Sequence, residues 1–221
     1  MPKILNRIIT HGCSFTYGEE LSDPALSSWP RLLADNLGTE LINLAKPGYN
    51  NDGIIQDILR LNLNMDDLVI ICWTSYIRMM FNDKDGWFTL MPHNKMNETF
   101  QYRSTLIKHF MDAVDDKWLY QRWLTQIILL QNYLESQHVK WLFLSAFDNQ
   151  HQYNKYRKHF IDILPKISSS NFVDWPNGGI TEWVYPSPLG PRGHPLEEGH
   201  KKVADKLASA VKHRYDFPRD Y

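Results

Sequence analysis

The chain has 221 residues, a length that suits one domain with a sizeable buried core. Its 24 Lys and Arg residues and 25 Asp and Glu residues leave a formal net charge of −1, which disfavours nucleic acid or an anionic membrane as a partner. The sequence has no apolar run long enough to span a bilayer, and its opening stretch MPKILNRIIT lacks the apolar core of a signal peptide. The two cysteines, Cys13 and Cys72, match neither a disulfide framework nor a zinc motif. We therefore expect a protein of a reducing compartment, the cytoplasm.

Short β-rich runs alternate with longer amphipathic segments along the chain. In chain order we expect a strand at 7–12, a helix at 27–38, a strand at 40–45, a helix at 51–63, a strand at 67–73, a helix at 116–137, strands at 139–147 and 171–175, and a closing helix at 195–215. The run DLVIICW is almost entirely apolar, as in a strand covered on both faces. This order predicts an α/β fold, a three-layer α/β/α sandwich around a mostly parallel sheet of about five strands.

Ligands of such sheets bind beyond the carboxyl ends of the strands. Ser14, Gly48 and Thr74 each follow an expected strand, and so does the loop after Asp174. Because parallel strands end at the same edge, we expect these residues on one rim of the sheet although they are far apart in sequence.

Residues 76–115 interrupt the simple alternation. Within them, the run RMMFNDKDGWFTLM places Asp-Gly between two apolar arms, which predicts a β-hairpin. We expect this insertion, rich in Met, Phe and Trp, to cover the rim or a partner, and packing against the core is the alternative. The sequence shows no second domain boundary, so residues 1–221 are interpreted as one domain with a hairpin and helical insertion.

The stretch THGCSFTYGEEL raises three interpretations of Ser14. A phosphate-binding loop is disfavoured, because Glu19 and Glu20 would repel a phosphate and no lysine stands at the required spacing. A helix cap is the second interpretation, and a nucleophile is the third, which requires a base and donors for an oxyanion. The two glutamates are otherwise expected to face water, and His11 is expected to pack in the core.

A candidate base lies near the end of the chain. The stretch GPRGHPLEEGH sets His194 in a Gly- and Pro-rich loop just before the closing helix, where backbone can hold the ring and leave it open to a pocket. His200 is a weaker candidate, because it lies inside the helix.

Three blocks, GCSFTYGEEL, NLAKPGYNN and GHPLEEGHKKVADKL, together resemble the SGNH (GDSL-type) hydrolase family, in particular its small divergent members from bacteria and their phages. The resemblance spans nearly the whole chain and implies a flavodoxin-like fold. It implies Ser14 as the nucleophile, His194 as its base, and the backbone N–H groups of Ser14 and Gly48 as oxyanion donors. It implies no cofactor and no metal, and a virion-associated location if the protein is phage-encoded.

Two positions depart from the family's pattern. Thr74, in the stretch CWTS, stands where the family has an asparagine whose amide donates to the oxyanion. A hydroxyl can also donate, and Asn50 or Asn51 can supply an amide instead.

The second departure concerns the acid. Pro191 stands where the family has an aspartate three residues before the histidine. Asp174 or Glu182, expected on the same rim, can substitute for it, and a backbone carbonyl is the alternative partner of the imidazole. Arg78, after the third expected strand, can bind a substrate carboxylate or pair with an acid.

These residues predict a serine ester hydrolase that removes a short acyl group from a sugar or another small polar alcohol. Its expected partner is a small-molecule or carbohydrate ester. Two alternatives stay open at this level: a binding or structural module that kept the fold without the chemistry, and an acyltransferase.

Overall fold

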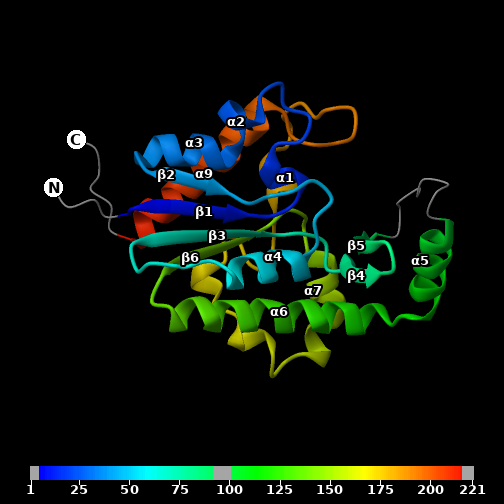
Figure 1. Ribbon diagram of the computed structural model, residues 1–221. Coiled ribbons are helices and arrows are strands. Elements are labelled where there is room, and N and C mark those ends of the chain that lie inside the picture. The colour runs from blue at the N-terminus through cyan, green and yellow to red at the C-terminus, as the bar shows by residue number, and fades with distance from the viewer. Residues whose placement is uncertain (1–4, 92–100, 216–221) are drawn as a thin grey trace.

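The central sheet has four parallel strands in the order β2-β1-β3-β6. The structure is a computed structural model, and it describes residues 5–91 and 101–215. The strands are β1 (Arg7–His11), β2 (Glu40–Asn43), β3 (Asp67–Trp73) and β6 (Lys140–Ser145). This order is that of a flavodoxin-like sheet, and it confirms the α/β fold predicted from the alternation. Figure 1 shows helices on both sides of the strands, so the fold has three layers.

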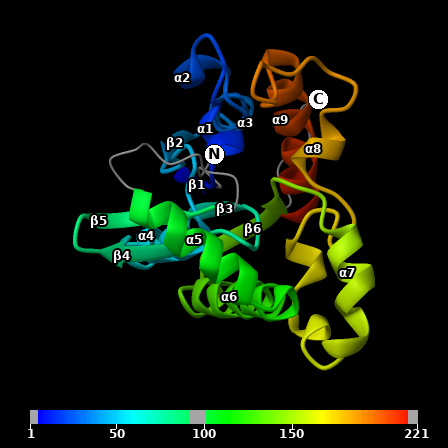
Figure 2. The same ribbon diagram turned by 90° about the vertical axis from the view of Figure 1, so that its right-hand side faces the viewer.

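One face of the sheet packs against α3 (Trp29–Leu37) and α9 (Glu197–Arg214). Alternate strand residues such as Ile8 and Ile70 point into this layer, where they join Leu33 and Leu207 in a cluster without solvent exposure. Figure 2 shows both helices above the strands. Because side chains alternate along a strand, every second strand residue packs into this layer.

The other face packs against α4 (Asn51–Leu59) and α6 (Asp116–Ser136). Ile9 and Val69, each next in sequence to a residue of the first face, meet Ile54 and Trp123 here. Because every residue of β3 is buried, the apolar run DLVIICW serves both layers at once.

The sheet has one strand fewer than the sequence predicts. In the segment 171–175, only Phe172 forms a parallel bridge, to Phe143, and the N–H of Val173 donates to the Phe143 carbonyl at 2.8 Å. The chain then turns away, because Asp174 adopts a left-handed conformation with φ of 57°. The expected fifth strand is therefore a single bridge at the position that a fifth strand would occupy.

The insertion contains the predicted hairpin. Strands β4 (Met79–Asp83) and β5 (Gly86–Leu90) pair antiparallel as a separate two-stranded sheet, and α5 (Gln101–Ala113) follows. The N–H of Met80 donates to Asp52 of α4 at 2.9 Å, which ties the hairpin to the body of the fold. Part of the insertion, 92–100, lies outside the described residues.

Shorter elements complete the chain: α1 (Ser14–Tyr17), α2 (Pro24–Ser27), α7 (Gln150–Tyr156), α8 (Ile180–Trp183), and the single 3₁₀ turns Arg157–His159, Leu164–Lys166 and Ser169–Asn171. Within the described residues, none of the helices combines the length and apolar character needed to cross a membrane. Figure 1 shows the hairpin and α5 beyond the end of the sheet at which α1 begins. That end is the rim to which the candidate site residues belong.

Candidate active site

Ser14 begins α1 directly after β1, and its side chain is almost fully buried. The short helix closes on Gly18, whose N–H donates to the Ser14 carbonyl at 2.9 Å, and Glu19 donates to the same oxygen at 3.1 Å. The N–H groups of Ser14 and Gly48 find no acceptor among the residues that the structure describes. Gly48 has φ of 70°, a conformation that glycine adopts without a steric penalty. Two backbone donors at the rim are therefore uncommitted.

His194 pairs with Glu20. The Nδ1 of the imidazole lies 2.7 Å from Oε2 of Glu20. The same carboxylate accepts the N–H of Arg192 at 2.9 Å and the N–H of His194 at 3.1 Å. Burial opposes ionisation of the carboxyl, but these three donors outweigh it and lower the pKa of Glu20. A carboxylate from the other end of the chain therefore contacts Nδ1 of His194, whereas Pro191, the position expected for the acid, carries none.

This pairing corrects two sequence-based expectations. Glu20 does not face water, since its side chain is only 11% exposed. The sequence predicts Asp174 or Glu182 as the acid, with a backbone carbonyl as the alternative. Asp174 instead pairs with Lys206 at 2.8 Å, and Glu182 accepts from the Thr181 hydroxyl at 2.8 Å. The expectation that either holds Nδ1 of His194 is wrong, because Glu20 occupies that position.

The backbone explains why Glu20 reaches the histidine. Glu20 has φ of 74°, a left-handed conformation that turns the chain back toward the loop 190–194. A Cβ on Gly190 would lie 2.7 Å from Cδ of Glu20, so this close approach requires glycine. The acidic pair in GEEL and the glycines of GPRGHP were the available sequence signals, although neither identifies the other as its partner.

A second carboxylate lies near the other ring nitrogen. Oε2 of Glu19 is 3.6 Å from Nε2 of His194, and Arg192 forms an ion pair with the same glutamate. The ring also packs against Phe15, with centroids 5.3 Å apart. No hydrogen bond joins Ser14 Oγ to His194 in the part of the chain described here. The segment 14–20 therefore surrounds the imidazole on several sides, with the serine at its start.

The three polar residues proposed near the oxyanion differ in how far they are committed. Asn50 caps α4 by accepting the N–H of Gly53 at 2.8 Å, and it donates to the Thr89 hydroxyl at 2.7 Å. Asn51 accepts the N–H of Thr74 at 3.0 Å and donates to the Thr74 carbonyl at 3.2 Å. The Oγ1 of Thr74 is buried without a hydrogen-bond partner. Its hydroxyl is therefore the uncommitted side-chain donor of this set.

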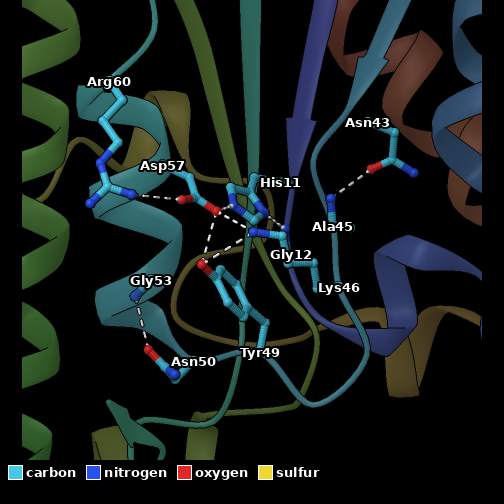
Figure 3. Close-up of polar contacts among 10 residues, drawn as sticks. All are labelled: His11, Gly12, Asn43, Ala45, Lys46, Tyr49, Asn50, Gly53, Asp57 and Arg60. Carbon is cyan, nitrogen blue, oxygen red and sulfur yellow. Dashed lines mark hydrogen bonds and ion pairs between the residues drawn. The ribbon is translucent and has the colours of Figure 1, made fainter. Parts of the chain in front are cut away.

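A polar cluster around the buried His11 supports the loop that carries Gly48 (Figure 3). The Nδ1 of His11 accepts the N–H of Gly12 at 2.9 Å, so the ring proton is assigned to Nε2, which lies 3.1 Å from Oδ2 of Asp57. The same carboxylate oxygen accepts from Lys46 Nζ at 2.8 Å and from the Tyr49 hydroxyl at 2.9 Å. Asp57 of α4 thereby holds both ends of the segment 46–49.

Burial lowers the pKa of His11 to about 4, although the bond to Asp57 acts in the opposite direction. His11 is therefore a neutral donor, buried in the core as expected and hydrogen-bonded there. His200 is also buried, with a pKa lowered to about 4, and it accepts the N–H of Trp29 at 3.1 Å. Both rings hold backbone in place and neither is available as a base.

Arg78 lies on the same rim, after β3. Its Nη1 donates to the Tyr49 carbonyl at 3.2 Å, and its Cζ lies 5.9 Å from the centre of the Phe147 ring. Of the residues in 5–91 and 101–215, no cluster of three or more His, Cys, Asp or Glu side chains is arranged to hold a metal ion.

The fold is that of the SGNH (GDSL-type) hydrolases, as three solved structures show. A member of the lipolytic G-D-S-L family from Veillonella parvula matches with a TM-score of 0.52 at 15% identity over 94% of this chain and 98% of its own. The esterase EstA from Pseudoalteromonas sp. matches with a TM-score of 0.56 at 15% identity, over 96% of this chain and 100% of its own. A family two carbohydrate esterase from Clostridium thermocellum matches with a TM-score of 0.55 at 14% identity, over 96% of this chain and 65% of its own.

Identities this low establish the shared fold and nothing finer. The chain belongs to the family of unknown function DUF6071, whose profile matches residues 19–219. The matched stretch includes Glu19, Glu20 and His194 and begins after Ser14. No curated protein matches the sequence.

Proposed function

We infer that this protein is a serine ester hydrolase in which Ser14, His194 and Glu20 act together. The observation that carries the inference is the 2.7 Å contact between Nδ1 of His194 and Glu20, made beside the segment that begins with Ser14. A carboxylate on Nδ1 fixes the tautomer that leaves Nε2 free to accept a proton, and it stabilises the imidazolium that then forms.

The reaction proceeds in two halves. His194 Nε2 takes the proton of Ser14 Oγ as the oxygen attacks the ester carbonyl carbon, and the carbonyl oxygen becomes an oxyanion. The N–H groups of Ser14 and Gly48 donate to it. The intermediate then collapses, and the leaving alkoxide takes the proton from His194. Water attacks the acyl-enzyme by the same route, which releases the acid and restores the serine.

Two features of the site concern its resting state. Ser14 and His194 are not hydrogen-bonded, and Glu19 faces the nitrogen that must receive the proton. Catalytic hydrogen bonds are often long without substrate and tighten in the complex, so substrate must bring Oγ and Nε2 together. The Thr74 hydroxyl is a further candidate oxyanion donor because nothing else uses it, and Asn50 is a second candidate through its amide.

The proposed substrate is an ester of a short acyl group with a sugar or another small polar alcohol. Phe147, which is partly exposed, packs edge-on against Phe15 at 5.1 Å and offers apolar surface near the serine. The match to a family two carbohydrate esterase supports a carbohydrate ester. The acyl group is short in this proposal because Ser14 is 4% exposed, which leaves little open surface around it.

A fluorophosphonate probe, which labels activated serines, tests the proposal. We expect labelling of the wild-type protein, loss of labelling in Ser14→Ala and strong reduction in His194→Ala. Ser145→Ala is the matched control, because Ser145 is also buried at the carboxyl end of a strand. A folded wild-type protein that does not label contradicts the enzyme and favours the binding module. Labelling combined with transfer of acetyl to an added alcohol, in preference to water, identifies an acyltransferase.

A further inference from the structure

The guanidinium of Arg78 joins two loops across the rim of the sheet. Its hydrogen bond goes to the carbonyl of Tyr49, the residue after Gly48, and its charged carbon lies over the ring of Phe147, which follows β6. Arg78 itself follows β3. The side chain is therefore placed among the loops that follow three of the four strands, in the region where ligands of this kind of fold bind.

Arg78 is linked to the reacting groups through two aromatic rings. Phe147 packs edge-on against Phe15 at 5.1 Å, and Phe15 is both the neighbour of Ser14 and the residue that contacts the His194 ring at 5.3 Å. On the other side, the Tyr49 carbonyl directly follows the Gly48 peptide that we assign to the oxyanion. A ligand that reaches Ser14 thus lies alongside the surface that Arg78 helps to form.

The charge of Arg78 has no carboxylate partner within residues 5–91 and 101–215. Nearby arginines differ in this respect: Arg103 pairs with Asp83, Arg122 with Asp52 and Arg192 with Glu19. A guanidinium offers five N–H donors, and the Tyr49 carbonyl engages one nitrogen of Arg78. The half-buried guanidinium therefore retains donors in the fork geometry that suits carboxylate and phosphate.

The two sides of the site carry opposite charge. Glu19 and Glu20 lie beside His194, and Arg192 offsets the charge of one of them, so this side keeps a net negative charge while the imidazole is neutral. Arg78 stands at the Tyr49 and Phe147 side. An anionic group on a substrate would be repelled from the first side and attracted to the second. This asymmetry selects one orientation for a substrate that carries both an ester and a negative charge.

We propose that Arg78 binds an anionic group, a carboxylate or a phosphate, on the ester substrate. The natural substrates are then acyl esters of acidic sugars or small acidic alcohols, or esters of a dicarboxylic acid. This proposal rests on the proposed function, because it names the substrate class of the same site.

Matched pairs of esters test the proposal and locate the anion. The first pair compares kcat/KM for neutral 4-nitrophenyl acetate with that for mono-4-nitrophenyl succinate, which carries a carboxylate on its acyl side. The second pair compares neutral methyl 4-acetoxybenzoate with 4-acetoxybenzoate, which carries a carboxylate on its alcohol side. Four-acetoxyphenyl phosphate replaces the carboxylate by phosphate. Each is measured with wild type, Arg78→Gln and Arg78→Lys. Arg31→Gln is the charge-matched control, since Arg31 already pairs with a carboxylate, Asp35, within α3.

We expect wild type to prefer the anionic member of at least one pair, and Arg78→Gln to lower kcat/KM for that ester by about 10- to 100-fold, as for a lost hydrogen bond to a charged group. The neutral ester should change by less than about threefold, Arg78→Lys should be intermediate, and Arg31→Gln should match wild type. Equal losses on neutral and anionic esters, or a wild type that does not discriminate, overturn the proposal.

Failure of the proposed function is separable from failure of this inference. If no ester is cleaved and Ser14 does not label, isothermal titration calorimetry with 4-hydroxybenzoate, succinate and phenyl phosphate measures anion binding without chemistry. Binding that is lost in Arg78→Gln and kept in Arg31→Gln supports the anion site in a protein that is not a hydrolase. No binding, or equal binding by wild type and Arg78→Gln, overturns it.

Discussion

Nδ1 of His194 lies 2.7 Å from Oε2 of Glu20, and the two residues are 174 positions apart in the chain. Three donors converge on that carboxylate, two of them backbone N–H groups of the histidine's own loop. The carboxylate therefore fixes the position of the loop as well as the tautomer of the ring.

Replacing Glu20 by glutamine should impair catalysis far more than folding. The amide keeps the shape but no longer stabilises the imidazolium, and the equivalent change in a serine protease lowers turnover about 10⁴-fold. We expect kcat for 4-nitrophenyl acetate to fall by about 10²- to 10⁴-fold. Glu198→Gln is the control, because Glu198 is bound by the Ser187 hydroxyl at 2.8 Å on the same part of the chain. A Glu20→Gln enzyme within threefold of wild type would exclude Glu20 from the mechanism.

Gly190→Ala should reproduce part of this loss without replacing any of the three catalytic residues. The added Cβ would lie 2.7 Å from Cδ of Glu20, so the carboxylate must move away from the ring. We expect activity to fall by about 10-fold or more, since small displacements of catalytic groups have effects of this size. Gly38→Ala is the comparison: it has φ of 62° but open space around the new Cβ, so it should lower stability by about 1 kcal/mol and leave activity intact. Equal activity of both variants contradicts the packing argument.

Thr74→Val should change stability and activity in opposite directions. The Thr74 hydroxyl is buried without a partner, so its removal should raise the free energy of unfolding by about 1 kcal/mol. If the same hydroxyl donates to the oxyanion, kcat should fall by about 10²-fold. Thr39→Val serves as control, because the Thr39 hydroxyl is also buried and unpaired but stands before β2, at the other end of the sheet. Unchanged kcat in Thr74→Val would remove Thr74 from the oxyanion site.

The buried histidines should make the protein less stable in mild acid. Burial lowers the pKa of His11 to about 4, whereas an unfolded histidine has a pKa of about 6.5. Between these values the unfolded chain binds the extra proton, so stability is complete above about pH 6.5 and falls as the pH drops toward 4. Each such histidine contributes a slope of up to about 1.4 kcal/mol per pH unit.

His11→Gln, measured by urea unfolding between about pH 5 and 6.5, should therefore show a shallower slope than wild type. The slope should persist in part, because burial lowers the pKa of His200 in the same way. His159→Gln, at an exposed position, controls for the loss of a histidine. Parallel slopes for wild type and His11→Gln would mean that His11 is protonated in the folded protein.

The hairpin and the strand at 171–175 show what local patterns decide. Asp-Gly between apolar arms correctly predicted β4 and β5, because turn chemistry and strand propensity are both local properties. The same reasoning predicted a strand at 171–175, where only Phe172 pairs. The left-handed conformation of Asp174 ends the pairing there. Because this residue is not a glycine, the sequence does not indicate the turn.

Hydrophobic periodicity and chain order are enough to predict the layered α/β fold and the positions of Ser14, Gly48 and Thr74 beyond the ends of successive strands. The contacts of Glu20 with His194 and of Asp57 with His11 became visible once the chain was folded. Such contacts depend on the paths of the loops. A residue with positive φ or a glycine without Cβ changes the path of a loop but does not alter the hydrophobic periodicity from which strands and helices are predicted.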